Sequence, residues 1–248
     1  MQTKALLVLA VLAALLAFSV VSTAQRTPNF VLDQLRGAIN RERGGSSFDY
    51  FVFSLTWPGN ACRQLQPCYI PSSTSDFTIH GLWPSRNTGP QGPFFCGGSF
   101  DYGQIQDLVP DLNKYWTDFK NEVPSFWQHE YEKHGTCAAS LPRMDTEYKF
   151  FKAALDLRKS MSVLPNLQKG GVTPSDSMVY HIQQLKSAMK AAGYGTPALA
   201  CYHGEQYITE MRFCTDKNLN FIDCPIRDQC HDTVLLNPIN PNNAKRRR

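Results

Sequence analysis

Cysteine content constrains this chain more strongly than any other feature of its sequence. The chain holds eight cysteines, an even number, and all of them follow residue 61. They are Cys62, Cys68, Cys96, Cys137, Cys201, Cys214, Cys224 and Cys230. None belongs to a Cys-x-x-Cys pair, which argues against a zinc ribbon or a thioredoxin-like redox site. We therefore expect four disulfides formed in an oxidising compartment, although spacing alone leaves their pairing open.

The N-terminus is typical of a secretory signal. Lys4 is the only charged residue of the segment 1–24, an apolar run follows from Ala5 to Val21, and Ser22-Thr23-Ala24 places small residues at the cleavage positions. The alternative is a transmembrane anchor, because the run approaches the length that spans a bilayer. The small-residue ending and the lack of a later apolar span favour cleavage. We expect a mature chain that begins near Gln25 and has no stable membrane association.

The length of 248 residues suits one well-buried domain. We expect a polar segment over 25–47, the folded domain over 48–231, and a basic, disordered tail over 232–248 that ends in Lys245–Arg248. Without Lys4 and the four cations at the end of the tail, 20 of the 25 basic residues remain, against 21 acidic ones. The folded body is therefore close to neutral, which argues against nucleic-acid binding through a broad basic surface.

Strands are predicted near both ends of the domain. Residues 48–57 are dense in aromatic and β-branched residues and end at a Pro-Gly turn, and a second short strand over 77–80 stops at the Gly-Leu-Trp-Pro of 81–84. Residues 87–98 are rich in Gly and Pro and predict an irregular loop. Three more strand-like runs are 198–203, 206–214 and 219–224.

Helical periodicity occupies the middle of the chain. Apolar residues recur at helical spacing over 105–119, where Pro110 implies a kink or a late start, and again over 144–161. The Thr-Pro-Ser-Asp of 173–176 predicts the start of a helix that runs to about 192 and stops at Gly193. Helices between groups of strands indicate an α+β fold with helices packed on a central, largely antiparallel sheet.

The segment 126–137 carries the densest set of reactive side chains. On a helix of about 100° per residue, His129, Lys133, Glu130 and His134 fall at about 0°, 40°, 100° and 140°, so all four share one face. Two proton-transfer groups with a cation and an anion beside them suit chemistry on a phosphodiester.

Three other interpretations of this segment were weighed. A His-Glu-x-x-His zinc protease motif would place its second histidine at the position of Lys133, and an ammonium there would be repelled by the metal. A Cys–His protease would need a free thiol, whereas Cys137 is expected in a disulfide. An ordinary surface helix explains Glu130 and Lys133, but not two histidines on one face.

A second motif covers residues 77–84, Phe-Thr-Ile-His-Gly-Leu-Trp-Pro. It places His80 at the end of a strand beside Trp83, whose ring can stack on a base. For either motif alone, the better interpretation is a half-buried histidine beside a structural tryptophan. The two motifs together change that balance.

Together, the two motifs resemble the active-site signatures of the ribonuclease T2 family, the secreted, vacuolar or lysosomal acid endoribonucleases. The Phe-Asp-Tyr-Phe of 48–51 with the Trp-Pro-Gly of 57–59 also looks like the first strand of that family. The resemblance covers 48 to about 230, so 48–231 is expected to be a ribonuclease T2-like catalytic domain. It implies the disulfides Cys62–Cys68, Cys96–Cys137, Cys201–Cys230 and Cys214–Cys224.

The resemblance also implies a role for each reactive residue. The 2′-hydroxyl of RNA is the nucleophile, so no metal or cofactor is expected, and the enzyme must move two protons and stabilise charge on phosphorus. His134 is the expected base and His80 the expected acid, roles that the sequence alone leaves interchangeable. His129 would hold the phosphate, while Glu130 and Lys133 would assist at the transition state.

The residues that bind the bases are less defined by the resemblance. Trp83 resembles the stacking residue of one base site and Phe126 an aromatic of the other, whereas Trp127 is expected in the core. Some fungal members carry Asp where this chain has Ser85 after Trp-Pro. The resemblance therefore does not fix the base preference.

We expect a secreted, monomeric, metal-independent endoribonuclease with RNA as its partner. It would cleave single-stranded RNA through 2′,3′-cyclic phosphates, which it would then hydrolyse to 3′-phosphates, with a mildly acidic pH optimum. Its setting would be extracellular or a lysosome-like acidic compartment. The alternative is a non-catalytic secreted binding or signalling protein with the same fold, since fold does not determine function.

Overall fold

The computed structural model describes residues 47–63, 65, 67–88, 92–120, 122–202 and 205–240. The predicted signal over 1–24, nearly all of the polar segment 25–47 and the basic end of the tail lie outside these ranges. The first part of the predicted disordered tail over 232–248 is ordered, because Thr233–Leu235 form a paired strand and Val234 and Leu236 are buried in the core. No helix within them is long and apolar enough to cross a membrane.

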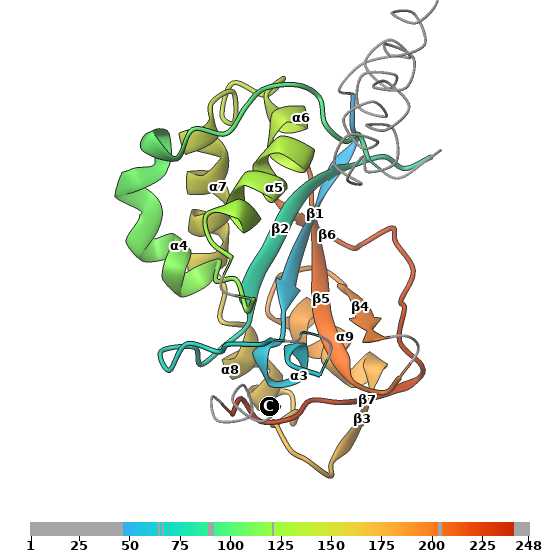
Figure 1. Ribbon diagram of the computed structural model, residues 1–248. Coiled ribbons are helices and arrows are strands. Elements are labelled where there is room, and N and C mark those ends of the chain that lie inside the picture. The colour runs from blue at the N-terminus through green and yellow to red at the C-terminus, as the bar shows by residue number, and fades with distance from the viewer. Residues whose placement is uncertain are drawn as a thin grey trace, which may run out of the picture.

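A five-stranded antiparallel sheet forms the centre of the domain (Figure 1). Its order is β2-β1-β5-β4, and β6 pairs with β5. The strands are β1 (Tyr50–Thr56), β2 (Thr78–Ser85), β4 (Ala198–Cys201), β5 (Ile208–Thr215) and β6 (Phe221–Ile222). The predicted α+β class and antiparallel sheet are confirmed, and the central strands come from the two ends of the domain.

The second strand is longer than predicted. It does not stop at Gly81 but continues to Ser85, which pairs with Tyr50 of β1. Pro84 is tolerated because β2 is an edge strand with one side free of ladder hydrogen bonds. Gly81 is a site of close approach, since a Cβ there would lie 2.1 Å from Nε1 of Trp83. The prediction that Gly81 and Pro84 end the strand is therefore wrong.

Helices gather beside β2 and behind the lower part of the sheet (Figure 1). In chain order they are α3 (Pro58–Ala61), the 3₁₀ helix η1 (Tyr102–Leu108), α4 (Val109–Tyr115), α5 (Ser125–Glu130), the π-helix η2 (Tyr131–Gly135), α6 (Thr136–Ala138), α7 (Glu147–Lys159), α8 (Val163–Lys169) and α9 (Ile182–Ala191). Of the two alternatives predicted for Pro110, a kink or a late start, the structure shows the late start, because the α-helix begins at Val109 after the 3₁₀ helix; it ends at Tyr115, before the predicted 119. The predicted irregular loop over 87–98 holds no helix or strand in its described part.

The predicted helix start at Thr173 is wrong. Residues 173–178 form neither helix nor strand, and β3 (Val179–His181) pairs with β7 (Thr233–Leu235) before α9 begins at Ile182. The backbone N–H of Ser175 donates to the carbonyl of Leu236, a long-range bond that no local capping signal reveals. The predicted stop is correct, because Gly193 has a φ of +85° after the last helical turn.

The structure contains the four disulfides that the resemblance implied: Cys62–Cys68, Cys96–Cys137, Cys201–Cys230 and Cys214–Cys224. The second of them ties the loop before η1 to the histidine segment. The last two tie the C-terminal segment to β4 and β5. Disulfides therefore join the walls of the site described below to the sheet.

Glu147, at the start of α7, is an acid in the core with one oxygen unsatisfied. Its side chain is buried, and its Oε2 accepts from the backbone N–H of Asp101 at 2.9 Å. Its Oε1 has no hydrogen-bond partner within the described residues. Burial, with the nearby Asp101 and Glu132, raises the pKa of Glu147 to about 7. Because the folded pKa lies above the ordinary value of 4.5, this group favours the folded state at low pH, and that advantage is lost as pH rises from about 4.5 to about 7.

We expect Glu147→Gln to raise the melting temperature above about pH 7 by several degrees and to change it little near pH 4. About 1 kcal/mol moves the melting temperature of a domain of this size by about 2–4 °C. Thermal unfolding across pH measures the effect, with Glu205→Gln as an exposed control. Parallel curves for Glu147→Gln and the unmodified chain would contradict it.

Candidate active site

The histidine segment folds as an α-helix interrupted by a π turn. The α-helix α5 passes into the π-helix η2 at Tyr131 and resumes as α6 at Thr136, so the angles of a regular α-helix do not apply. Such π turns occur often at functional sites. The four predicted residues nevertheless line one cavity of about 650 Å³: His129, Glu130, Lys133 and His134. Tyr131 faces the other way, onto Phe150 and Phe151.

His80 reaches the same cavity from β2 because it is the extra residue of a β-bulge. Ser54 of β1 pairs with Gly81 and Leu55 pairs with Ile79, so His80 between them has no partner on β1. A bulge of this kind re-aims a side chain. The carbonyl of His80 accepts from Nε1 of Trp116 at 2.8 Å, which fixes the backbone of the bulge against the core.

Glu130 joins the helix to the strand. Its side chain is buried, its Oε2 accepts from Nε1 of Trp83 at 2.8 Å, and its Oε1 lies 3.7 Å from Nε2 of His80. Burial raises the pKa of the Glu130 carboxyl above its ordinary value, although His80 and the Trp83 hydrogen bond act in the opposite direction. The tryptophan ring is thereby fixed in orientation.

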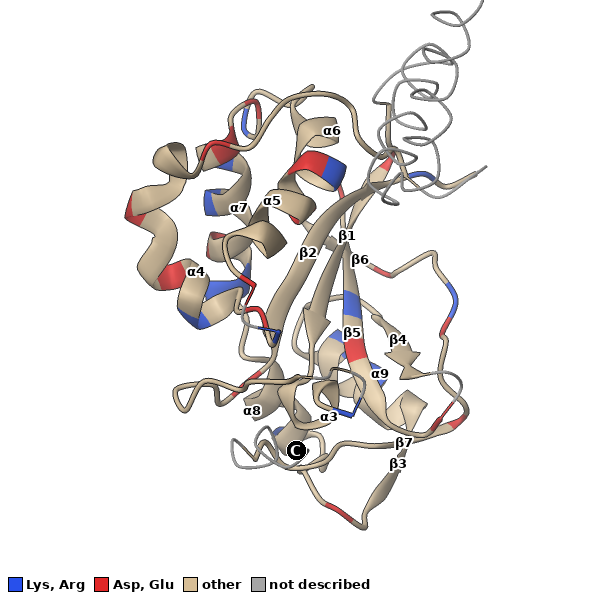
Figure 2. Ribbon diagram, in the orientation of Figure 1, with Lys and Arg blue, Asp and Glu red and all other residues tan. Residues whose placement is uncertain are grey.

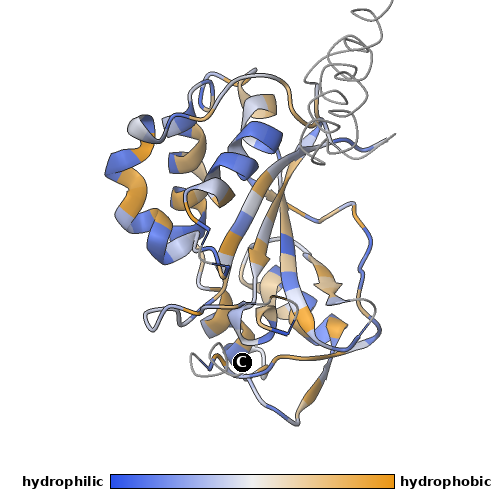
Figure 3. Ribbon diagram, in the orientation of Figure 1, coloured by the Kyte–Doolittle hydropathy of each residue, from blue (hydrophilic) through white to orange (hydrophobic). Residues whose placement is uncertain are grey.

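Two residues of β5 were missed by the sequence analysis. Nδ1 of His80 is hydrogen-bonded to Oε1 of Glu210, and Oε2 of Glu210 accepts from Nε and Nη2 of Arg212 at 2.9 and 2.7 Å. Figure 2 shows this acidic and basic pair side by side on β5, and Figure 3 shows the alternating hydropathy of that strand. That alternation was the available signal, because Met211 and Phe213 fill the core while Glu210 and Arg212 face the site.

The two histidines that share this cavity have opposite protonation. Burial alone would lower the pKa of His80, but Glu210 and then Glu130 outweigh it and raise that pKa to about 9. His134 is buried, and burial together with Lys133, His80 and His129 holds its pKa well below 6.5. Near neutral pH, His80 is therefore an imidazolium and His134 a neutral imidazole.

The remaining predicted residues surround this pair. The Trp83 ring lies between the two histidines, with ring centroids 5.1 Å from His80 and 5.4 Å from His134. Phe126 lies 6.0 Å from the His80 ring, and Lys133 Nζ lies 5.6 Å from the Phe94 ring centre. Trp127 is in the core, as expected, with its Nε1 donating to the carbonyl of Trp116.

A second cavity of about 480 Å³ lies on the other side of His80. His80, Phe126 and His129 line both cavities, so these residues separate two binding spaces. Ser85 lines the larger space, and its hydroxyl donates to the carbonyl of Trp83 at 3.0 Å. Nowhere in the described ranges do three or more His, Cys, Asp or Glu side chains gather as a group that could hold a metal.

An imidazolium and a neutral imidazole at one cleft can donate and accept a proton at two points of one substrate. Opposite pKa shifts are the pattern expected of an acid–base pair. Two flat aromatic rings and a cation beside them suit a ligand with bases and a phosphate.

Comparison with known proteins gives a consistent result. The sequence model of the Ribonuclease T2 family matches residues 48–224. Ribonuclease Oy of Magallana gigas is 36% identical over 186 residues, covering 71% of this chain and 87% of the relative. Extracellular ribonuclease LE of Solanum lycopersicum is 35% identical over 191 residues, covering 72% of this chain and 81% of the relative. The crystal structure of RNase NT in complex with 5′-AMP superimposes with a TM-score of 0.67 at 32% identity, covering 77% of this chain and 99% of that one.

We expect the imidazole nitrogens of His80 and His134 to differ in protonation at about pH 7.5, because their pKa values lie on either side of it. ¹⁵N chemical shifts of histidine-labelled protein should show both nitrogens of His80 protonated and one nitrogen of His134 bare. The loss of each signal in His80→Ala and His134→Ala assigns it. A neutral His80 ring at that pH would contradict the electrostatic account.

Proposed function

The chain belongs to the ribonuclease T2 family and is an endoribonuclease of that type, and we propose that it cleaves single-stranded RNA by acid–base catalysis between His134 and His80. The observation that carries this proposal is that His80 and His134 line one cavity with different charged neighbours. His80 lies against Glu210 and Glu130, whereas the charged neighbours of His134 are cationic, so their pKa values shift in opposite directions. The substrate supplies its own nucleophile, so the proposal needs no metal.

In the first step, neutral His134 takes the proton of the 2′-hydroxyl as its oxygen attacks phosphorus. His80 gives its Nε2 proton to the departing 5′-oxygen, and the products are a 2′,3′-cyclic phosphate and a free 5′-hydroxyl. In the second step, water attacks the cyclic phosphate while His80, now neutral, accepts its proton. His134 then protonates the 2′-oxygen as the 3′-phosphate forms, which restores both histidines.

The reaction also requires that the negative charge on the phosphate be stabilised in the transition state. Lys133 and His129 line the larger cavity next to His134, where they can hold the non-bridging oxygens. Glu130 lies behind them, bonded to Trp83 and close to Nε2 of His80. We assign Glu130 and Lys133 to assistance at the transition state and His129 to phosphate binding.

The two cavities suit the nucleosides on either side of the scissile phosphate. Trp83 faces the larger cavity and Phe126 lies between the two, so each offers a ring for stacking. The hydroxyl of Ser85 is bonded to the backbone of Trp83, so it contributes little to base selection in this arrangement. Binding by stacking predicts broad tolerance of sequence.

The proposed setting is secretion or an acidic, lysosome-like compartment. It is supported by the signal-like segment 1–24, by four disulfides, and by the relative named as an extracellular ribonuclease. We propose that the chain acts as a monomer without stable membrane association.

We expect His80→Ala and His134→Ala each to lower kcat by about 10²–10⁴-fold, the usual contribution of one general acid or base. RNA digestion with purified variants measures the loss, and circular dichroism checks the fold. His181→Ala, an exposed histidine outside both cavities, is the matched control. Near-normal turnover in a folded His80 or His134 variant would exclude that residue from the assigned role.

Substrate chemistry gives a separate test. RNA should be cut in the presence of EDTA, whereas DNA and 2′-O-methyl RNA should resist, because the attacking 2′-hydroxyl is absent or blocked. Mass spectrometry of early products should show 2′,3′-cyclic phosphates. Comparable cleavage of DNA, or loss of RNA cleavage on chelation, would overturn the mechanism.

A further inference from the structure

Glu210 is the carboxylate hydrogen-bonded to Nδ1 of His80, and the roles assigned above do not include it. It lies on β5, two strands away from β2, with its side chain only 13% exposed. The core residues Met211 and Phe213 alternate with Glu210 and Arg212, so the pair faces the site by the pleat of the strand.

Small residues in the intervening strand allow this contact. Ser54 of β1 pairs with Gly81 of β2 on one side and with Arg212 of β5 on the other. Ser54 is the short side chain between Gly81 and Arg212 in this row, and the bulged His80 meets Glu210 across β1. Side chains from β5 can therefore reach across β1 to the edge strand.

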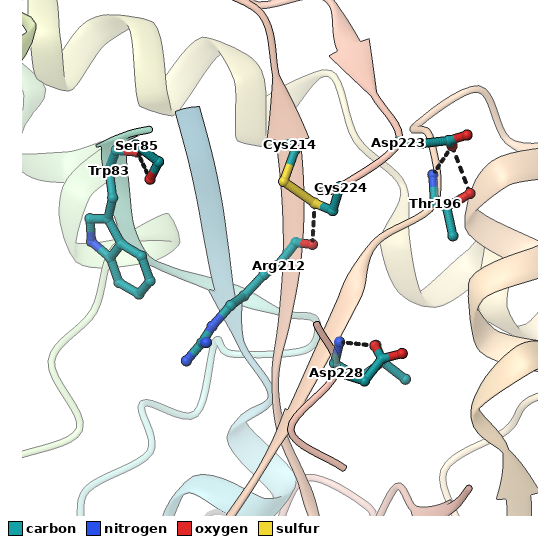
Figure 4. The surroundings of a disulfide bond; sticks show 9 residues. Trp83, Ser85, Thr196, Arg212, Cys214, Asp223, Cys224 and Asp228 are labelled. Atoms are coloured by element: carbon teal, nitrogen blue, oxygen red, sulfur yellow. Dashed lines mark hydrogen bonds between the residues drawn. A yellow bond between two sulfur atoms is a disulfide. The ribbon is translucent and has the colours of Figure 1, made fainter. Parts of the chain in front are cut away.

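Both carboxylate oxygens of Glu210 have partners. Oε1 accepts from Nδ1 of His80, while Oε2 accepts from two nitrogens of Arg212. The Arg212 guanidinium lies 5.7 Å from the centre of the Trp83 ring, and Figure 4 shows it extending from β5. Arg212 thus holds the carboxylate in place and is itself held against the tryptophan.

A fixed bond at Nδ1 determines what the other nitrogen of His80 can do. An imidazole that donates its Nδ1 proton to a carboxylate keeps one ring orientation and presents Nε2 to the cavity. We propose that Glu210 is the positioning residue that holds His80 as the general acid, a role that rests on the proposed ribonuclease function. Arg212 fixes the carboxylate that performs it.

The charges around His80 support the same role. Burial opposes the imidazolium, Glu210 of β5 is the largest influence in its favour, and Glu130 of α5 adds to it. Arg212 of β5 opposes the imidazolium. Lys133 lines the larger cavity and His129 lines both, while Asp118, Lys120 and Glu122 line the smaller one. The pKa of Glu210 itself is held at about 2 by His80 and Arg212, in spite of burial.

The sign of the expected effect follows from these charges. Without the carboxylate of Glu210, the pKa of His80 falls, so the protonated acid is lost at a lower pH than in the unmodified enzyme. The basic limb of the kcat/KM profile therefore moves toward acid. At acidic pH the ring is protonated in both forms, and the difference narrows.

The test compares two substrates across pH. A ribodinucleoside monophosphate has an alkoxide leaving group that needs the acid, whereas a uridine 3′-(4-nitrophenyl phosphate) releases a stable phenolate that does not. We expect Glu210→Gln to lower kcat/KM on the dinucleotide by about 10–100-fold above neutral pH, with the basic limb moved by about one pH unit or more. On the nitrophenyl ester the loss should stay below about threefold, as it should for His80→Ala.

The controls separate positioning from folding and from the proposed function itself. Glu205→Gln should match the unmodified enzyme, and Glu210→Asp, which keeps the charge, should keep its basic limb nearer to that of the unmodified enzyme. If Glu210→Gln does not fold, Glu210→Asp must still lose more rate on the dinucleotide than on the ester. Equal losses on both substrates, or a profile identical to that of the unmodified enzyme, overturn the role of Glu210. An unmodified enzyme that cleaves neither substrate overturns the ribonuclease proposal instead.

Discussion

The hydrogen bond from Trp83 to Glu130 joins the two halves of the site. One partner lies on the edge strand β2 and the other at the end of α5, so this bond sets how the strand and the π turn face one another. Gly81 is required beside it, because a Cβ there would lie 2.2 Å from Glu130 Oε2, well inside van der Waals contact. The stacking ring, the carboxylate and the bulged histidine are thus fixed by one local arrangement.

Burial has opposite outcomes for the two histidines because their neighbours differ. Desolvation lowers the pKa of both rings. His80 contacts two carboxylates, from α5 and β5, which reverse the effect, whereas the charges near His134 are cationic and add to it. In the proposed mechanism, the placement of Glu210, a residue far from both motifs in the sequence, therefore determines which histidine is the acid.

Sequence reasoning could group residues that share a short motif, but it failed where a position depends on strand pairing. His80, Glu130 and His134 were found because they lie in two short motifs, and the structure brings them to one cleft. Glu210 was missed because nothing near it in the chain indicates that β5 lies two strands from His80. The false helix start at Thr173 has the same cause, since the β3–β7 pairing and the Leu236 contact override a sound capping signal.

The base, rather than the acid, is the harder group to provide in an acidic setting. An ordinary histidine, with a pKa near 6.5, is mostly protonated below that pH and cannot accept the 2′ proton. Burying His134 among Lys133, His129 and His80 keeps it neutral at lower pH, while an acid such as His80 is protonated there without help. The carboxylate beside His80 therefore matters most toward neutral and alkaline pH. Glu147 favours the folded state in acid in a similar way, because burial raises its pKa and its carboxyl is then neutral. In the proposed mechanism, the burial of these groups suits both the chemistry and the fold to mildly acidic conditions.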